Sequence, residues 1–175
     1  LIDRGRQWAT TVDDISDATG LSAERASELA AVQQRLGGST DALVRGFAAM
    51  SKSVYGNRAA WKEMGVAVAT TGNGGVDAYQ TFQNLRSAIS ATGGSLLSTA
   101  AAQKVMGRGG KDLLDLLQLT DKQYRMLADD ARRSGQVMSD EAAAAAEALS
   151  RALRILRKIA FEHRQAGAIA IRHVR

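Results

Sequence analysis

Apolar residues recur three or four positions apart along almost the whole chain, and this is the spacing of one face of an α-helix. In the longest early run the apolar positions are Leu43, Phe47, Met50, Val54, Trp61 and Met64. A second run consists of Tyr79, Phe82, Leu85 and Ile89. Both runs predict amphipathic helices that pack through these faces.

Glycine clusters interrupt the helical pattern. They lie at Gly37-Gly38, Gly72 to Gly75, Gly93-Gly94, Gly107 to Gly110 and Gly135. Glycine in a helix interior costs about 1 kcal/mol relative to Ala, so each cluster predicts the end of a helix. We therefore predict an all-α fold of about six or seven helices, arranged as glycine-punctuated hairpins or a bundle with a long C-terminal helix. Residues 66–69 are the most strand-like, but a single short strand has no partner, so we expect coil or a helical extension.

The longest uninterrupted pattern lies at the end of the chain. Ser139 can cap a helix whose first turn carries Asp140 and Glu141, and no helix breaker follows before Gly167. Positions with alternating spacings of three and four are Ala142, Ala146, Leu149, Leu153, Leu156, Ala160, His163, Gly167, Ala170 and Val174. This heptad seam predicts a surface that packs against another helix, either from the same chain or from a second copy. Its strongest members are Leu149, Leu153, Leu156 and Ala160.

The length of this last helix sets the division of the chain. It would run on the order of 50 Å at the usual rise per residue. Because the sequence ends inside the helical pattern, we expect the helix to continue beyond residue 175. We divide the chain into a helical region over residues 1–138 and a long basic amphipathic helix over residues 139–175.

Composition favours helices packed closely together over a thick core with a deep ligand pocket. The chain has 175 residues and no Pro, whereas average usage of about 5% would give roughly nine. Aromatic residues make up only 5% of a sequence that is 45% hydrophobic, so the apolar side chains are mostly small. There is no Cys, which excludes disulfides and thiolate metal sites. No apolar run is long enough for a transmembrane helix.

The net charge of +5 is concentrated in the last helix. Residues 151–175 carry seven basic groups and a single acidic one, Glu162. A basic amphipathic helix can bind nucleic-acid phosphates or lie on an anionic membrane. A solvated flank of a helix bundle accounts for the same pattern, and we favour that interpretation.

A glycine-rich segment invites comparison with phosphate-binding loops, because the backbone amides of such loops bind anions. The nucleotide-binding form needs a glycine five positions before the Gly-Lys pair and Ser or Thr after the lysine. Here Val105 stands at the glycine position and Asp112 at the hydroxyl position. The segment therefore predicts a helix-breaking hinge at Gly107, Gly109 and Gly110.

The other residues that could carry chemistry are spaced unfavourably. His163 and His173 are ten positions apart, so they cannot share a metal as an i, i+4 pair would. Neighbouring aspartates at residues 13–14 and 129–130 point about 100° apart on a helix. Two histidines near the end of the chain support no Ser-His-Asp arrangement. We expect no catalytic residue, cofactor or metal, and hence not an enzyme.

Four segments together resemble the tail tape measure proteins of tailed bacteriophages and prophages. They are residues 17–22 (DATGLS), 35–43 (RLGGSTDAL), 105–117 (VMGRGGKDLLDLL) and 135–141 (GQVMSDE). The resemblance covers most of residues 15–155. The chain departs from the family at Met106, where Phe is common, and at Asp115, where Pro is common.

This resemblance implies a structural protein of the virion. Family members are long helical chains that set the length of the tail tube during assembly and assist genome ejection. Their implied partners are tail tube subunits, tail assembly chaperones, tail tip proteins and further copies of the chain. The implied location is the lumen of the tail tube, with the host cytoplasm during assembly. The alternative function is a membrane-active or nucleic-acid-binding helical module that acts through the basic C-terminal helix.

Overall fold

The computed structural model describes residues 2–93 and 96–172, with the side chains of most of them. The helices are α1 (Ile2–Thr19), α2 (Ala23–Arg35), α3 (Thr40–Gly56), α4 (Arg58–Glu63), α5 (Ala78–Ala91), α6 (Leu96–Asp112), α7 (Leu114–Leu117), α8 (Asp121–Arg133) and α9 (Asp140–Arg172). The described residues contain no strand, only an isolated antiparallel bridge between Thr70 and Val76. The predicted all-α fold is confirmed.

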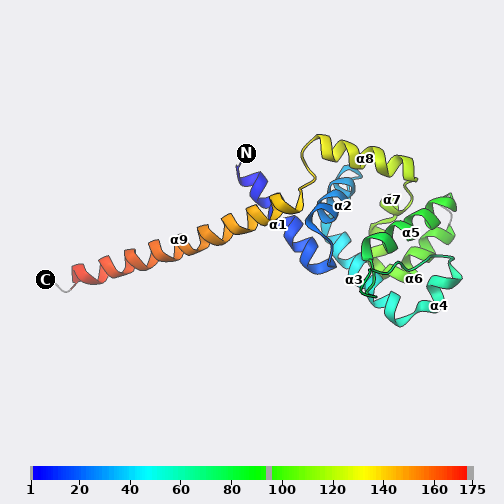
Figure 1. The fold of residues 1–175 in the computed structure, drawn as a ribbon, viewed down its shortest axis with the longest axis horizontal. Coiled ribbons are helices and arrows are strands. Elements are labelled where there is room, and N and C mark those ends of the chain that lie inside the picture. The colour runs from blue at the N-terminus through cyan, green and yellow to red at the C-terminus, as the bar shows by residue number, and fades with distance from the viewer. Residues whose placement is uncertain (1, 94–95, 173–175) are drawn as a thin grey trace.

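Eight of these helices form a body, and α9 projects from it as a single rod (Figure 1). At the centre of the body α3 lies against α6. Phe47 of α3 stacks on Phe82 of α5, with ring centroids 5.0 Å apart. Trp61 of α4 is also fully buried. The two apolar runs recognised in the sequence therefore meet in one core.

One helix boundary differs from the prediction. The segment expected to be one helix up to Met64 is divided at Asn57, whose backbone leaves helical geometry and whose side chain accepts a hydrogen bond from Ala60 N at 3.4 Å. The leucine-rich segment after residue 111 forms the one-turn helix α7, which is separate from α6. These extra breaks raise the number of helices in the described residues to nine, above the expected six or seven.

Local sequence features account for other helix boundaries. Thr120 and Gln123 form a capping box at the start of α8, as both of their reciprocal bonds are present. Residues 66–69 are coil between α4 and the Thr70–Val76 bridge. Gly37 follows α2 with a φ of +77°, a backbone conformation that favours glycine.

The base of α9 is fastened to α2. The backbone N–H of Met138 donates to Ser27 Oγ at 2.9 Å. The backbone N–H of Glu24 donates to Asp140 Oδ1 at 3.1 Å. Ala143 is buried against the body. The first turn of α9 is thus held in place, while the helix continues away from the body (Figure 1).

Candidate functional site

One side of α9 faces the body at its base. Asp140, Ala143, Ala144, Glu147 and Arg154 line a groove of about 510 Å³ between α9 and the end of α1. From α1 the same groove is lined by Asp13, Ser16 and Asp17. The side of α9 that meets the body is therefore mainly polar. We call it the body-facing side.

Another side of α9 carries the large apolar residues. We call it the apolar face, and it consists of Leu149, Ala152, Leu153, Ile155, Leu156 and Ile159. The exposed fractions of Leu149, Leu156 and Ile155 are 58%, 60% and 55%, and Leu153 is half-buried. Soluble monomers rarely leave such a contiguous apolar strip in water.

The structure describes the side chains of three of the four strongest residues of the predicted seam. Leu149, Leu153 and Leu156 share one face of α9 but do not enter the core of the body. The side chain of Ala160 lies outside the described residues, as do those of His163 and His173. That the seam binds another helix remains a prediction.

The basic side chains that the structure describes on α9, those of Arg151, Arg154 and Lys158, lie away from its apolar face. Arg151 pairs with Glu147 at 2.5 Å, and Arg154 lines the groove that holds Asp13 and Asp17. Part of the positive charge at the base of α9 is thus opposed by carboxylates. Four more basic side chains lie outside the described part of the chain, namely those of Arg157, Arg164, Arg172 and Arg175.

The groove also gathers carboxylates around Asp13. Burial raises the pKa of Asp13 above its ordinary value, and the nearby charges of Glu147, Asp17 and Asp14 raise it further. The junction between α1 and α9 therefore disfavours the ionised form of Asp13.

The glycine-rich segment lies inside α6. Gly107 has the non-helical values φ 57° and ψ −143°, and it divides α6 into two helical stretches that meet at a kink. A Cβ added at Gly109 would lie 2.7 Å from Gly46 N of α3, and one at Gly110 would lie 2.4 Å from the carbonyl oxygen of Ala102. Gly109 and Gly110 thus serve close packing, and the predicted break is a kink at Gly107. Movement about this hinge remains a prediction.

A buried carboxylate connects three helices. Glu28 of α2 is 1% exposed. Its Oε1 accepts hydrogen bonds from the hydroxyls of Tyr79 and Tyr124, both at 2.7 Å, and its Oε2 pairs with Arg132. We call these four residues the Glu28 cluster. It joins α2 to α5 and α8.

Two arginines extend the Glu28 cluster. The guanidinium of Arg25 lies 4.3 Å from the ring centroid of Tyr79, and that of Arg86 lies 4.7 Å from that of Tyr124. Arg86 is buried and pairs with Asp121 at 2.5 Å, which holds the pKa of Asp121 below its usual value. Burial raises the pKa of both tyrosines. The phenols therefore remain hydrogen-bond donors at neutral pH.

Sequence reasoning missed the Glu28 cluster. Glu28 reads as an ordinary polar position of an amphipathic helix, yet residues 26–33 of α2 are all buried. Its partners come from positions 51 to 104 residues further along the chain. No local spacing reports such an arrangement.

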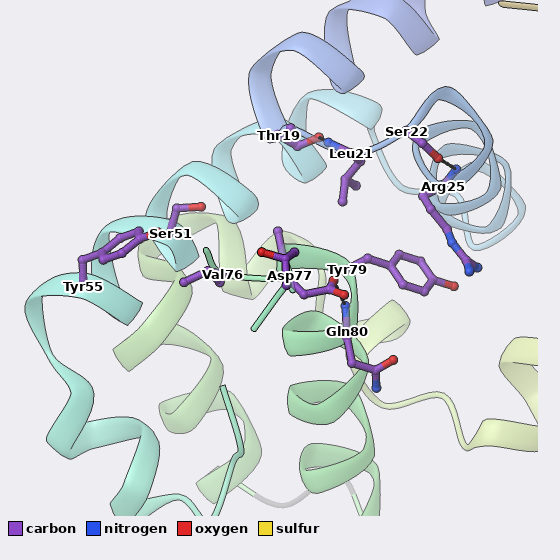
Figure 2. A pocket seen from close by; sticks show the side chains of 13 residues that line it. Thr19, Leu21, Ser22, Arg25, Ser51, Tyr55, Val76, Asp77, Tyr79 and Gln80 are labelled. Atoms are coloured by element: carbon purple, nitrogen blue, oxygen red, sulfur yellow. Dashed lines mark hydrogen bonds between the residues drawn. The ribbon is translucent and has the colours of Figure 1, made fainter. Parts of the chain in front are cut away.

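A pocket of about 430 Å³ lies beside this cluster, between the turn after α1, α3 and the start of α5 (Figure 2). Several of its polar groups already have partners within the body. Ser22 accepts from Arg25 N, and Asp77 accepts from Gln80 N at 2.8 Å to cap α5. Figure 2 shows Tyr55 and Ser51 on the α3 side of the pocket. Ser22 and Asp77 thus support helix ends, and none of the described side chains of the pocket forms a nucleophile–base pair.

Two further observations concern chemistry and membranes. Among the residues that the structure describes, no group of three or more His, Asp or Glu side chains could hold a metal ion. In the same residues no helix has the length and apolarity needed to cross a bilayer. The expected absence of catalysis and cofactors remains a prediction.

No protein-family model, curated protein or solved structure matches this chain. The sequence motifs and the geometry of the body and α9 are therefore the features that bear on function.

Proposed function

We propose that this chain is a structural protein of the tape measure type, which sets tail tube length during phage assembly and assists genome ejection. The observation that carries the proposal is α9, a helix of 33 residues that leaves the body after its first turns. A protein that measures length needs helical segments whose extension is set by residue number, because each residue adds about 1.5 Å.

Three further features support this proposal. The body is built from Pro-free helices punctuated by glycine. The tape-measure-like segments fall at structural junctions: residues 17–22 join α1 to α2, residues 35–43 join α2 to α3, and residues 135–141 precede and begin α9. Residues 105–117 include the kink of α6 and all of α7.

The test uses tails purified from the phage or induced prophage that encodes the chain. Six extra copies of residues 142–155, inserted in tandem, preserve the heptad phase and should lengthen the tail by roughly 125 Å. A matched control scrambles residues 142–155 without changing their number, and tail length should then be unchanged. Tails that lack the chain, or that keep their length after the insertion, would contradict the proposal.

One observation favours a second candidate function. Arg151, Arg154 and Lys158 are all exposed on α9, and the helix is amphipathic, as in helices that bind anionic bilayers or nucleic acid. In that case the chain should bind anionic vesicles or duplex DNA with an affinity that falls steeply with salt. Neutral vesicles are the control. Binding that is equal in low and high salt would exclude this candidate.

A further inference from the structure

We propose that a groove between α4 and residues 66–76 binds an extended peptide segment of a partner protein, in which carboxylates flank an aromatic side chain. Three features of the groove support this assignment, namely its apolar floor, the two cations that line it and the unpaired main-chain groups beside it. Such binding goes beyond the tape-measure role and does not depend on it.

The groove has a volume of about 440 Å³ and a floor made of apolar side chains. Trp61 and Val66 are buried at this floor, and Val68 and Val76 are half-buried there. Tyr55 lines the same groove and is 65% exposed, the largest exposed fraction of any large hydrophobic residue in the described part of the chain. An exposed aromatic ring beside an open apolar floor is a surface on which a partner can bury an aromatic side chain.

The groove lies at the end of the body that is remote from α9. In Figure 1, α4 is at the opposite end of the body from the point where α9 leaves it. Tyr55 and Val76 line both the groove and the neighbouring pocket of Figure 2. A partner bound at α4 therefore leaves the apolar face of α9 uncovered.

Two cations line the groove without a carboxylate partner. Arg58 and Lys62 are exposed and lie one turn apart on α4. The only acidic residue of α4, Glu63, pairs with Lys104 at 2.9 Å. No acidic side chain lines the groove, and neither cation forms an ion pair within the described part of the chain. The groove thus presents positive charge that carboxylates of a partner can compensate.

The main chain beside the groove has unpaired hydrogen-bonding groups. The hydrogen bonds on either side of the Thr70–Val76 bridge make it a non-hydrogen-bonded antiparallel pair, so the N–H and C=O of Thr70 point away from its partner strand. Val68, two positions earlier, has the same orientation in an extended chain. The carbonyl of Ala67 and the N–H of Ala69 bond instead to side chains of α5. Among the described residues no hydrogen bond uses the main-chain groups of Val68 or Thr70.

These unpaired groups favour a peptide over other occupants. An extended peptide that pairs with an exposed edge satisfies N–H and C=O groups on both chains. Its alternate side chains then lie on the groove side, because Val68, Thr70 and Val76 line the groove from one face of the main chain. A carboxylate two positions from an aromatic residue points to that same side, where Arg58 and Lys62 lie. An anionic amphiphile would meet the cations and the floor but leave the edge unpaired.

Fluorescence anisotropy with the 175-residue chain tests the proposal. The probe is a fluorescein-labelled peptide of sequence Thr-Glu-Thr-Phe-Thr-Glu-Thr, in which Phe and both Glu can face the groove. We expect saturable binding below about 1 mM. Replacing Phe by Ala, or both Glu by Lys, should weaken binding about tenfold, because the aromatic anchor or the charge complementarity is lost. A wild-type chain that does not bind the probe in this range would overturn the proposal.

Charge variants of the protein locate the site. Arg58→Glu/Lys62→Glu should weaken binding of the probe about tenfold. The matched control Lys122→Glu/Arg125→Glu makes the same change in net charge at exposed positions of α8, outside the groove. This control should bind the probe as the wild type does. Equal weakening by both variants would overturn the proposal, since only the net charge would then matter.

Thr70→Pro separates a peptide from other occupants, because it removes a main-chain N–H at the edge and no hydrogen bond of the described residues. It should weaken binding about fivefold, as expected for one lost hydrogen bond. Thr70→Val keeps the N–H and should bind the probe as the wild type does. Octanoate that displaces the probe, together with an affinity for the probe that Thr70→Pro leaves unchanged, would overturn the proposal and assign the groove to an anionic amphiphile.

Discussion

At the scale of single residues, the least expected feature is a carboxylate in the core of a protein with few polar core residues. Burying Glu28 is costly unless its charge is paired and its oxygens are hydrogen-bonded. Tyr79 and Tyr124 donate to one oxygen and Arg132 to the other. The carboxylate therefore fixes the relative positions of α2, α5 and α8.

Glu28→Gln should lower the free energy of unfolding by about 2 kcal/mol, since hydrogen bonds to a charged group are lost and a phenol is left with a weaker acceptor. Urea denaturation of the variant measures the change. Glu24→Gln is the matched control, because Glu24 lies one turn earlier and its Oε1 is as far as 4.0 Å from Arg132 Nη2, a much weaker contact. Its cost should be below about 1 kcal/mol. Equal costs for both variants would contradict a special role of Glu28.

Gly109→Ala should destabilise the protein by about 2 to 4 kcal/mol, because the new methyl group overpacks the contact of α6 with α3. The methyl carbon would lie 2.7 Å from Gly46 N, a backbone atom that cannot move aside alone. Gly56→Ala is the control, since a Cβ there meets nothing within 4 Å. Thermal melting of both variants distinguishes close packing from flexibility. A stabilised Gly109→Ala variant would show that the site has room.

At the scale of elements, the sequence predicted faces better than boundaries. Leu43, Phe47 and Phe82 were recognisable because helical periodicity is local, and the structure buries all three. Asn57 was only a polar gap in the pattern, and its role as a cap depends on φ and ψ values that spacing does not encode. The Glu28 cluster could not be predicted from local spacing, because the partners of Glu28 come from helices distant in the sequence. Which side of α9 meets the body was equally hidden.

The junction of α1 with α9 should respond to pH through Asp13. Its pKa is raised in the folded state, so ionisation of Asp13 costs the folded chain more than the unfolded one. This penalty is absent at low pH. The penalty appears as the pH rises through 3.8, the ordinary pKa of an aspartate, and it is complete above the raised pKa of Asp13 in the folded chain.

Asp13→Asn should therefore stabilise the protein at pH 7 by less than about 1 kcal/mol, since the groove is open to solvent. The gain should disappear near pH 3, where the wild-type carboxyl is protonated as well. Urea denaturation at both pH values measures the difference. Asp14→Asn, an exposed neighbour on the same helix, should change stability less. An equal gain at both pH values would mean that packing, not charge, is responsible.

At the scale of the whole molecule, the body and the distal part of α9 are held by different interactions. The body has a buried core, and it secures the base of α9 with hydrogen bonds from Glu24 N and Met138 N. Beyond Arg154 the described side chains of α9 are exposed. A lone helix of this kind is marginal in water, because helices owe most of their stability to packing of an apolar face.

This separation predicts two unfolding transitions with different dependence on protein concentration. The only two tryptophans, Trp8 and Trp61, belong to the body, so tryptophan fluorescence follows the body alone. Far-ultraviolet circular dichroism also follows α9. If copies of the chain associate through α9, mass action should raise the midpoint of the α9 transition as the concentration increases. The fluorescence midpoint should stay constant.

Removal of residues 155–175 supplies the control for this last prediction. It should abolish the concentration-dependent transition and leave the fluorescence midpoint within about 4 °C of wild type, the shift expected for roughly 1 kcal/mol in a chain of this size. A fluorescence midpoint that rises with concentration together with the dichroism signal would show that the bodies themselves take part in association. The surface that joins the copies would then lie on the body, and α9 would be free for another partner.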